Sequence, residues 1–128
     1  MKNPYTGPAM PEQVVVVFCE EYARGSFVVR ALTGAGYAVR WVTRVETALR
    51  LAARERVDAL VADARSDDVL GSLVSGWRRR TPPGTPVVLL TRLGDAASVA
   101  LAEVVSSPLT AEGVRAAVDH ALGARARA

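Results

Sequence analysis

The sequence predicts an α/β fold, in which helices cover both faces of a parallel β-sheet. Two observations carry this prediction. Short segments of five or six mostly apolar residues recur five times along the 128-residue chain, and stretches with apolar residues at helical spacing lie between most of them. Such alternation implies strand–helix–strand units with right-handed crossovers. The length suits a single domain with a sizeable core.

The first half of the chain begins with VVVVF at 14–18, a continuous apolar run typical of a strand that is covered on both faces. The helix predicted next has one apolar face, which consists of Val28, Ala31, Leu32 and Ala35. Gly34 and Gly36 supply a stop for this helix. AVRWVT at 38–43 alternates like a strand with unequal faces, and VETALRLAARER at 45–56 returns to helical spacing.

The second half repeats the pattern. DALVA at 58–62 predicts a buried strand, and VLGSLVSGWRRR at 69–80 predicts a helix that ends at the breaker TPPGTP. PVVLLT at 86–91 and AEVVSS at 102–107 predict the last two strands. TAEGVRAAVDHAL predicts the closing helix, with Thr110 as its N-cap. We therefore expect a leader at 1–12, a domain at 13–123 and a tail at 124–128, with no output domain attached.

Composition narrows the functional classes. The chain has one cysteine and no apolar signal core, which fits a reducing cytoplasm. No apolar run approaches the roughly 20 residues that cross a bilayer, so no membrane is expected. The net charge is +3, and the run Arg78–Arg80 complements a helix dipole at its end. No base-contacting element and no aromatic side chains for base stacking accompany these charges, so direct binding of nucleic acid is not expected.

Polar groups follow four of the predicted strands, and in such folds ligands collect at the carboxyl ends of strands. These groups are Cys19, Glu20, Glu21, Asp63, Thr91, Ser106 and Ser107. Three carboxylates in one crevice would suit magnesium, which prefers oxygen ligands. A carboxylate beside magnesium can act as a nucleophile toward a phosphoryl group. Asp63 is then a candidate phosphoryl acceptor, and the hydroxyl of Thr91 could bond a phosphate oxygen.

Residues 13–122 resemble the receiver domain of two-component response regulators. Asp63, at the end of VDALVAD, stands where that family carries its phosphoacceptor aspartate, and Gly71 matches the glycine that follows it. Thr91 stands at the switch Ser/Thr position, and Pro108 at the proline of Lys-Pro. The resemblance implies a flavodoxin-like sheet of order 2-1-3-4-5, magnesium as cofactor, and a histidine kinase that phosphorylates Asp63.

The chain also departs from that family at four places. The acidic pair after the first strand falls on Cys19 and Glu20, so a thiol replaces one magnesium-binding acid. Ser107 replaces the lysine, and Val104 stands near the position of the switch aromatic. The segment 91–108 is short, which leaves a fourth helix that is short or missing. These departures predict a weak magnesium site on Glu20 and Asp63, or none, with Glu21 as a possible substitute.

Three functions are compatible with these residues, and none of them is an enzyme. The first choice is an atypical receiver, or pseudo-receiver, that acts through protein contacts with a kinase or a downstream effector. The alternative is a functional switch that is phosphorylated on Asp63. The third is an α/β domain that binds a small molecule in the crevice. Apolar residues exposed by a lost helix, such as Val99 and Leu101, would favour a homodimer.

Each candidate residue also has a purely structural interpretation. Asp63 could be a polar residue where a buried strand meets water. Glu20 and Glu21 could be solvated acids at a helix start, where the dipole favours them. Cys19 is expected to be a small buried residue and not a reactive thiol, because neighbouring negative charge raises a thiol pKa.

Overall fold

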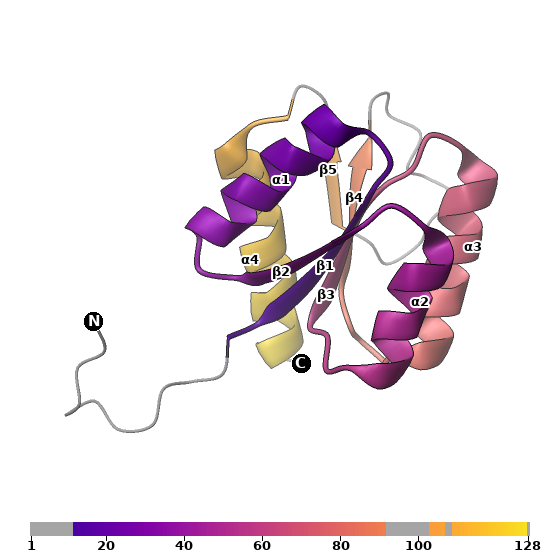
Figure 1. Ribbon diagram of the computed structural model, residues 1–128. Coiled ribbons are helices and arrows are strands. Elements are labelled where there is room, and N and C mark those ends of the chain that lie inside the picture. Colours follow the sequence, from indigo (N-terminus) through magenta and orange to yellow (C-terminus); the bar gives the residue numbers. More distant parts are fainter. Residues whose placement is uncertain (1–11, 92–102, 107–108, 128) are drawn as a thin grey trace.

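A computed structural model gives the structure of the chain and describes residues 12–91, 103–106 and 109–127 (Figure 1). Strands and helices alternate along most of it. In chain order they are β1 (Val14–Cys19), α1 (Tyr22–Gly34), β2 (Ala38–Val42), α2 (Val45–Arg54), β3 (Ala59–Asp63), α3 (Asp67–Arg80), β4 (Val87–Thr91), β5 (Glu103–Ser106) and α4 (Ala111–Arg127).

The strands form one parallel sheet of order β2-β1-β3-β4-β5. The α/β class and the parallel sheet predicted from the sequence are confirmed. β1 lies between β2 and β3, and its last residue, Cys19, is the register partner of Asp63, the last residue of β3. The carboxyl ends of these two central strands therefore bring their side chains together at one edge of the sheet.

Two apolar cores lie on opposite faces of the sheet, because successive side chains of a strand point to opposite sides. Helices α1 and α4 cover one face, and α2 and α3 cover the other (Figure 1). The first core contains Val15, Val17, Cys19, Ala59, Val61, Val28, Leu32, Val114 and Val118. The second contains Val16, Phe18, Leu60, Ala62, Ala48, Ala52, Leu73, Val74 and Trp77. Asp63 has the parity of Ala59 and Val61, so it belongs to the face that α1 covers.

Helix α1 lies close to the sheet because it carries glycine where it crosses Trp41 of β2. A Cβ atom on Gly25 would come within 2.3 Å of the Trp41 ring. The ring also donates a hydrogen bond from Nε1 to the carbonyl of Cys19, at 3.2 Å. This packing sets the distance between the start of α1 and the end of β1.

Some boundaries differ from the sequence predictions. β3 is shifted by one residue and includes Asp63, because this aspartate continues the ladder with β1. Helix α4 runs to Arg127, so most of the predicted tail at 124–128 continues the helix. The leader up to residue 11, the predicted short fourth helix, Val99 and Leu101 lie outside the described residues. Within the part of the chain that is described, no helix is long and apolar enough to cross a membrane.

Candidate functional site

Asp63 lies at the carboxyl end of β3 and is almost completely buried, with a relative exposure of 5%. Its carboxylate faces the thiol of Cys19, whose Sγ lies 3.4 Å from Asp63 Oδ2. The same thiol also lies 3.3 Å from the carbonyl oxygen of Glu21. The sequence therefore places a carboxylate and a thiol side by side, where the family that the chain resembles carries acidic residues.

Arg24 holds the carboxylate of Asp63. Its Nε donates a hydrogen bond to Asp63 Oδ2 at 2.6 Å, and the two side chains form an ion pair with relative exposures of 18% and 5%. Arg24 is the third residue of α1, so the first turn of the helix delivers the cation. Charge-assisted bonds of this kind are stronger than neutral ones. The sequence analysis did not single out Arg24.

The two oxygens of Asp63 have different surroundings. Both the guanidinium of Arg24 and the thiol of Cys19 contact Oδ2. Among the described residues, Oδ1 has no hydrogen-bond partner. Arg24 Nη2 is a buried donor without an acceptor in the described part of the chain. The ion pair therefore uses one atom from each group and is not the bidentate fork that arginine can form.

Glu20 and Glu21 do not join Asp63. Glu20 is exposed in the loop after β1. Glu21 is half-buried at the N-cap position of α1, where its side chain makes no cap hydrogen bond. It lies 3.7 Å from Arg65, measured from Glu21 Oε2 to Arg65 Nη2. In the described part of the chain, the three carboxylates therefore do not form one metal-binding group, because the chain turns into α1 directly after Glu21.

The remaining predicted positions are placed only by the backbone. Thr91 ends β4 and pairs with Ser106 of β5, at the same edge of the sheet as Asp63. Val104 lies inside β5, in register with Leu89. Ser107 and Pro108 are outside the described residues. The hydroxyl role of Thr91 and the consequences of Val104 and Ser107 stay predictions.

Burial, together with the negative charge of Asp63, raises the pKa of the Cys19 thiol to about 11. The thiol is therefore neutral near pH 7 and can donate its proton to a neighbouring oxygen. Only the thiolate is an effective metal ligand or nucleophile. Cys19 thus acts as a small buried hydrogen-bond donor beside the carboxylate, in agreement with the structural interpretation above.

Magnesium does not fit this donor set well. It needs several oxygen ligands in a near-octahedral arrangement. Here the described residues supply one carboxylate, and a guanidinium and a neutral thiol already contact one of its oxygens. In the described part of the chain, no group of three or more acidic, histidine or cysteine side chains could hold a metal ion. The pairing of Glu20 with Asp63 as metal ligands gains no support, which leaves the magnesium site weak or absent.

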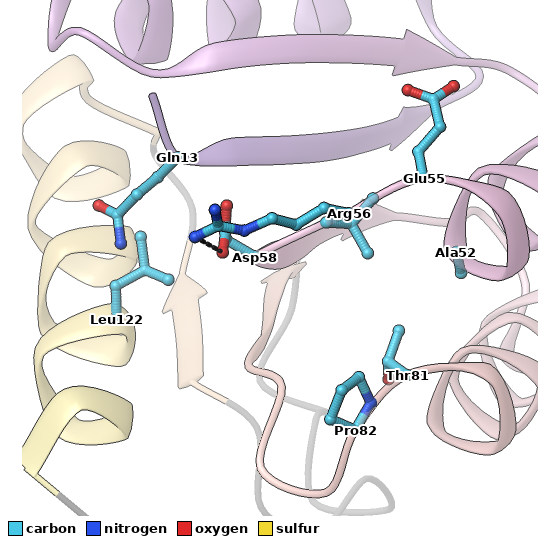
Figure 2. A pocket seen from close by; sticks show the side chains of 9 residues that line it. Gln13, Ala52, Glu55, Arg56, Asp58, Thr81, Pro82 and Leu122 are labelled. Atoms are coloured by element: carbon cyan, nitrogen blue, oxygen red, sulfur yellow. Dashed lines mark ion pairs between the residues drawn. The ribbon is translucent and has the colours of Figure 1, made fainter. Parts of the chain in front are cut away.

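A cavity of about 510 Å³ lies at the opposite edge of the sheet, near the amino ends of β1 and β3 (Figure 2). Asp58 and Arg56 form an ion pair inside it, with 3.6 Å between Asp58 Oδ1 and Arg56 Nη2. Gln13 and Leu122 flank the pair on one side, and Thr81 and Pro82 line another wall. This cavity is not the crevice predicted from the sequence, which lies at the carboxyl edge.

Comparison with known proteins finds relatives among transcriptional regulatory proteins. No family model matches the chain. It is 32% identical over 97 residues to the transcriptional regulatory protein GlrR of Escherichia coli K12, and equally to QseF of E. coli O157:H7. The match covers 71% of this chain but 22% of either relative, so the chain spans about a fifth of the length of the curated relatives it matches.

Solved structures agree on the fold. A response regulator receiver protein from Sinorhizobium medicae has a TM-score of 0.79 at 20% identity, covering 89% of this chain and 97% of that one. The receiver domain of the sensor histidine kinase PA1611 from Pseudomonas aeruginosa has a TM-score of 0.77 at 20% identity, covering 88% and 99%, and carries a magnesium ion in its active site cleft. The resemblance to response-regulator receiver domains is therefore confirmed, and the chain has the receiver fold.

Proposed function

We propose that this chain is an atypical receiver domain of two-component signalling that acts mainly through protein contacts, because its phosphorylation site is degenerate. The receiver fold and the similarity to GlrR and QseF support a signalling role. A receiver fold is a signalling module and does not itself imply an enzyme. The partners that this role implies are a histidine kinase or a downstream effector protein.

The ion pair between Arg24 and Asp63 carries the degenerate part of the proposal. A carboxylate that attacks phosphorus must present a free lone pair to the phosphoryl group. Here the carboxylate is 5% exposed and one oxygen accepts a 2.6 Å bond from a guanidinium. Developing charge on the phosphoryl oxygens must also be neutralised by cations or hydrogen-bond donors. Magnesium does not fit the described donors, and the family lysine is Ser107 here.

One observation favours the alternative, in which Asp63 is a working phosphoacceptor. Its second oxygen, Oδ1, has no hydrogen-bond partner among the described residues, since Arg24 and Cys19 both contact Oδ2. That oxygen could reach a phosphoryl donor while Arg24 neutralises the other. The two candidates differ in whether Oδ1 reacts at a useful rate.

Labelling with small phosphoryl donors separates the two candidates. The purified chain is incubated with acetyl phosphate and magnesium, or with magnesium, beryllium and fluoride, and intact-mass spectrometry and fluorine NMR detect adducts. We expect no phosphoryl adduct and no bound beryllofluoride under conditions that label a competent receiver domain. An adduct that is present in the wild type and absent in Asp63→Asn would refute the degenerate site and establish the phosphoacceptor switch.

A further inference from the structure

We infer that Arg24 is the resident cation of this site and replaces a divalent metal ion beside Asp63. The inference deepens the proposed function, since it explains why the site would be degenerate. It assigns the change to two residues, Cys19 and Arg24, which lie on different elements and both contact Asp63 Oδ2. The site is then independent of metal, whether or not Asp63 is phosphorylated.

Arg24 has the position and the charge that this role needs. It is delivered by the first turn of α1, its side chain is 18% exposed, and its Nε lies 2.6 Å from Asp63 Oδ2. A guanidinium remains protonated at every physiological pH. The aspartate therefore always has a positive partner, and a metal ion would have to displace a covalently attached cation that is already desolvated.

Cys19 is the second part of the replacement, because a thiol stands where a carboxylate would supply an oxygen ligand to the metal. It is the register partner of Asp63, so its side chain stands on the neighbouring strand at the same edge and on the same face. A carboxylate at this position would double the local negative charge and offer magnesium a second oxygen. The thiol, neutral and soft, offers neither. The loss of the acid and the gain of the guanidinium keep the local charge balanced, because one cation faces one anion.

Reversal of both changes tests the inference by gain of metal binding. The four proteins are the wild type, Cys19→Asp, Arg24→Met and the double variant C19D/R24M. Thermal unfolding of each protein is measured in a magnesium salt and, as a control, in a sodium salt at the same ionic strength. Trp41 gives a second readout, because its indole Nε1 bonds the Cys19 carbonyl at 3.2 Å, whereas Trp77 lies in the core on the other face.

We expect magnesium to raise the unfolding midpoint only in C19D/R24M, by roughly 4 °C at ten times the dissociation constant, together with a saturable change in Trp41 fluorescence. Cys19→Asp alone should not respond, since Arg24 would still occupy Asp63 Oδ2 and offset one of the two negative charges. Arg30→Met is the matched control, because Arg30 is exposed on the same helix. A magnesium response in the wild type, or an equal response with and without Arg24, would overturn the inference.

A double-variant cycle keeps the inference testable if C19D/R24M does not fold. Arg24→Met, Asp63→Asn and their combination are compared by thermal unfolding without magnesium. If the double variant loses much less stability than the two single variants lose together, the assignment of Arg24 as the resident cation is supported. If the losses add, the assignment is refuted. The outcomes also separate the two proposals. If the wild type is labelled by the phosphoryl donor but its unfolding midpoint does not respond to magnesium, only the degenerate-site proposal is refuted. If the wild type is not labelled and the losses in stability are additive, only the assignment of Arg24 is refuted.

Discussion

Two buried aspartates flank the same central strand and are held in different ways. Asp58 precedes β3 and Asp63 ends it, and each is 5% exposed. Asp58 accepts a hydrogen bond from the backbone N–H of Val14 at 2.7 Å, and its ion-pair partner, Arg56, is 68% exposed. Among the described residues, the carboxylate of Asp63 is held by the side chains of Arg24 and Cys19.

This difference separates a structural carboxylate from an exchangeable one. The backbone donor of Val14 is present whatever side chain stands there, so Asp58 pins the start of β1 to the start of β3. The partners of Asp63 come from two positions that substitution can change without altering the backbone. The carboxyl edge of the sheet therefore carries a carboxylate that side chains hold, whereas the amino edge carries one that also bonds the backbone.

The largest expected effect is at Asp63. Asp63→Asn keeps an oxygen for the Arg24 hydrogen bond but leaves a largely buried guanidinium without a counter-charge. Removal of one partner from a buried pair costs about 3 kcal/mol or more, so we expect a loss of about 3 kcal/mol in the free energy of unfolding near pH 7. Urea unfolding with an unchanged m-value measures it. A loss below roughly 1 kcal/mol would mean that the ion pair behaves like a solvated one.

The sequence determines the framework better than the site, and particular residues show why. The run VVVVF and the breaker TPPGTP depend on local periodicity and turn chemistry, which act within a few residues. The start of α1 at Tyr22 can also be predicted from the sequence. So can the face of the sheet to which Asp63 belongs, because Ala59 and Val61 alternate with Leu60 and Ala62 across the sheet. Together they place Asp63 on the face that α1 covers.

The sequence does not predict which arginine pairs with Asp63. Arg65 stands two residues after Asp63, whereas Arg24 is 39 residues away in sequence. The structure gives Arg65 to Glu21, at 3.7 Å, and Arg24 to Asp63. Which of two arginines reaches a carboxylate depends on side-chain lengths and on how closely α1 approaches the sheet. That approach is set by Gly25 and Trp41, which are not neighbours in the sequence.

The second prediction concerns this approach. Gly25→Ala places a methyl group 2.3 Å from the Trp41 ring, so either α1 or the ring must shift. Overpacking of this kind typically costs 1–3 kcal/mol, and we expect about 2 kcal/mol by urea unfolding. Arg24 should also move away from Asp63, because it is adjacent to Gly25 in the same turn. Gly34→Ala is the matched control, since a Cβ there meets nothing within 4 Å; an equal loss in both variants would show that packing on Trp41 is not the cause.

The smallest effect is expected at Asp58, although it is as deeply buried as Asp63. Asp58→Asn retains a side-chain oxygen that can accept the 2.7 Å bond from Val14 N. The charge that it loses faces Arg56, whose exposed guanidinium returns to water at little cost, so the loss should be about 0.5 kcal/mol. The same Asp-to-Asn change is thus expected to cost several times more at one end of β3 than at the other. Equal losses would show that depth of burial, and not the identity of the partner, determines what these carboxylates contribute.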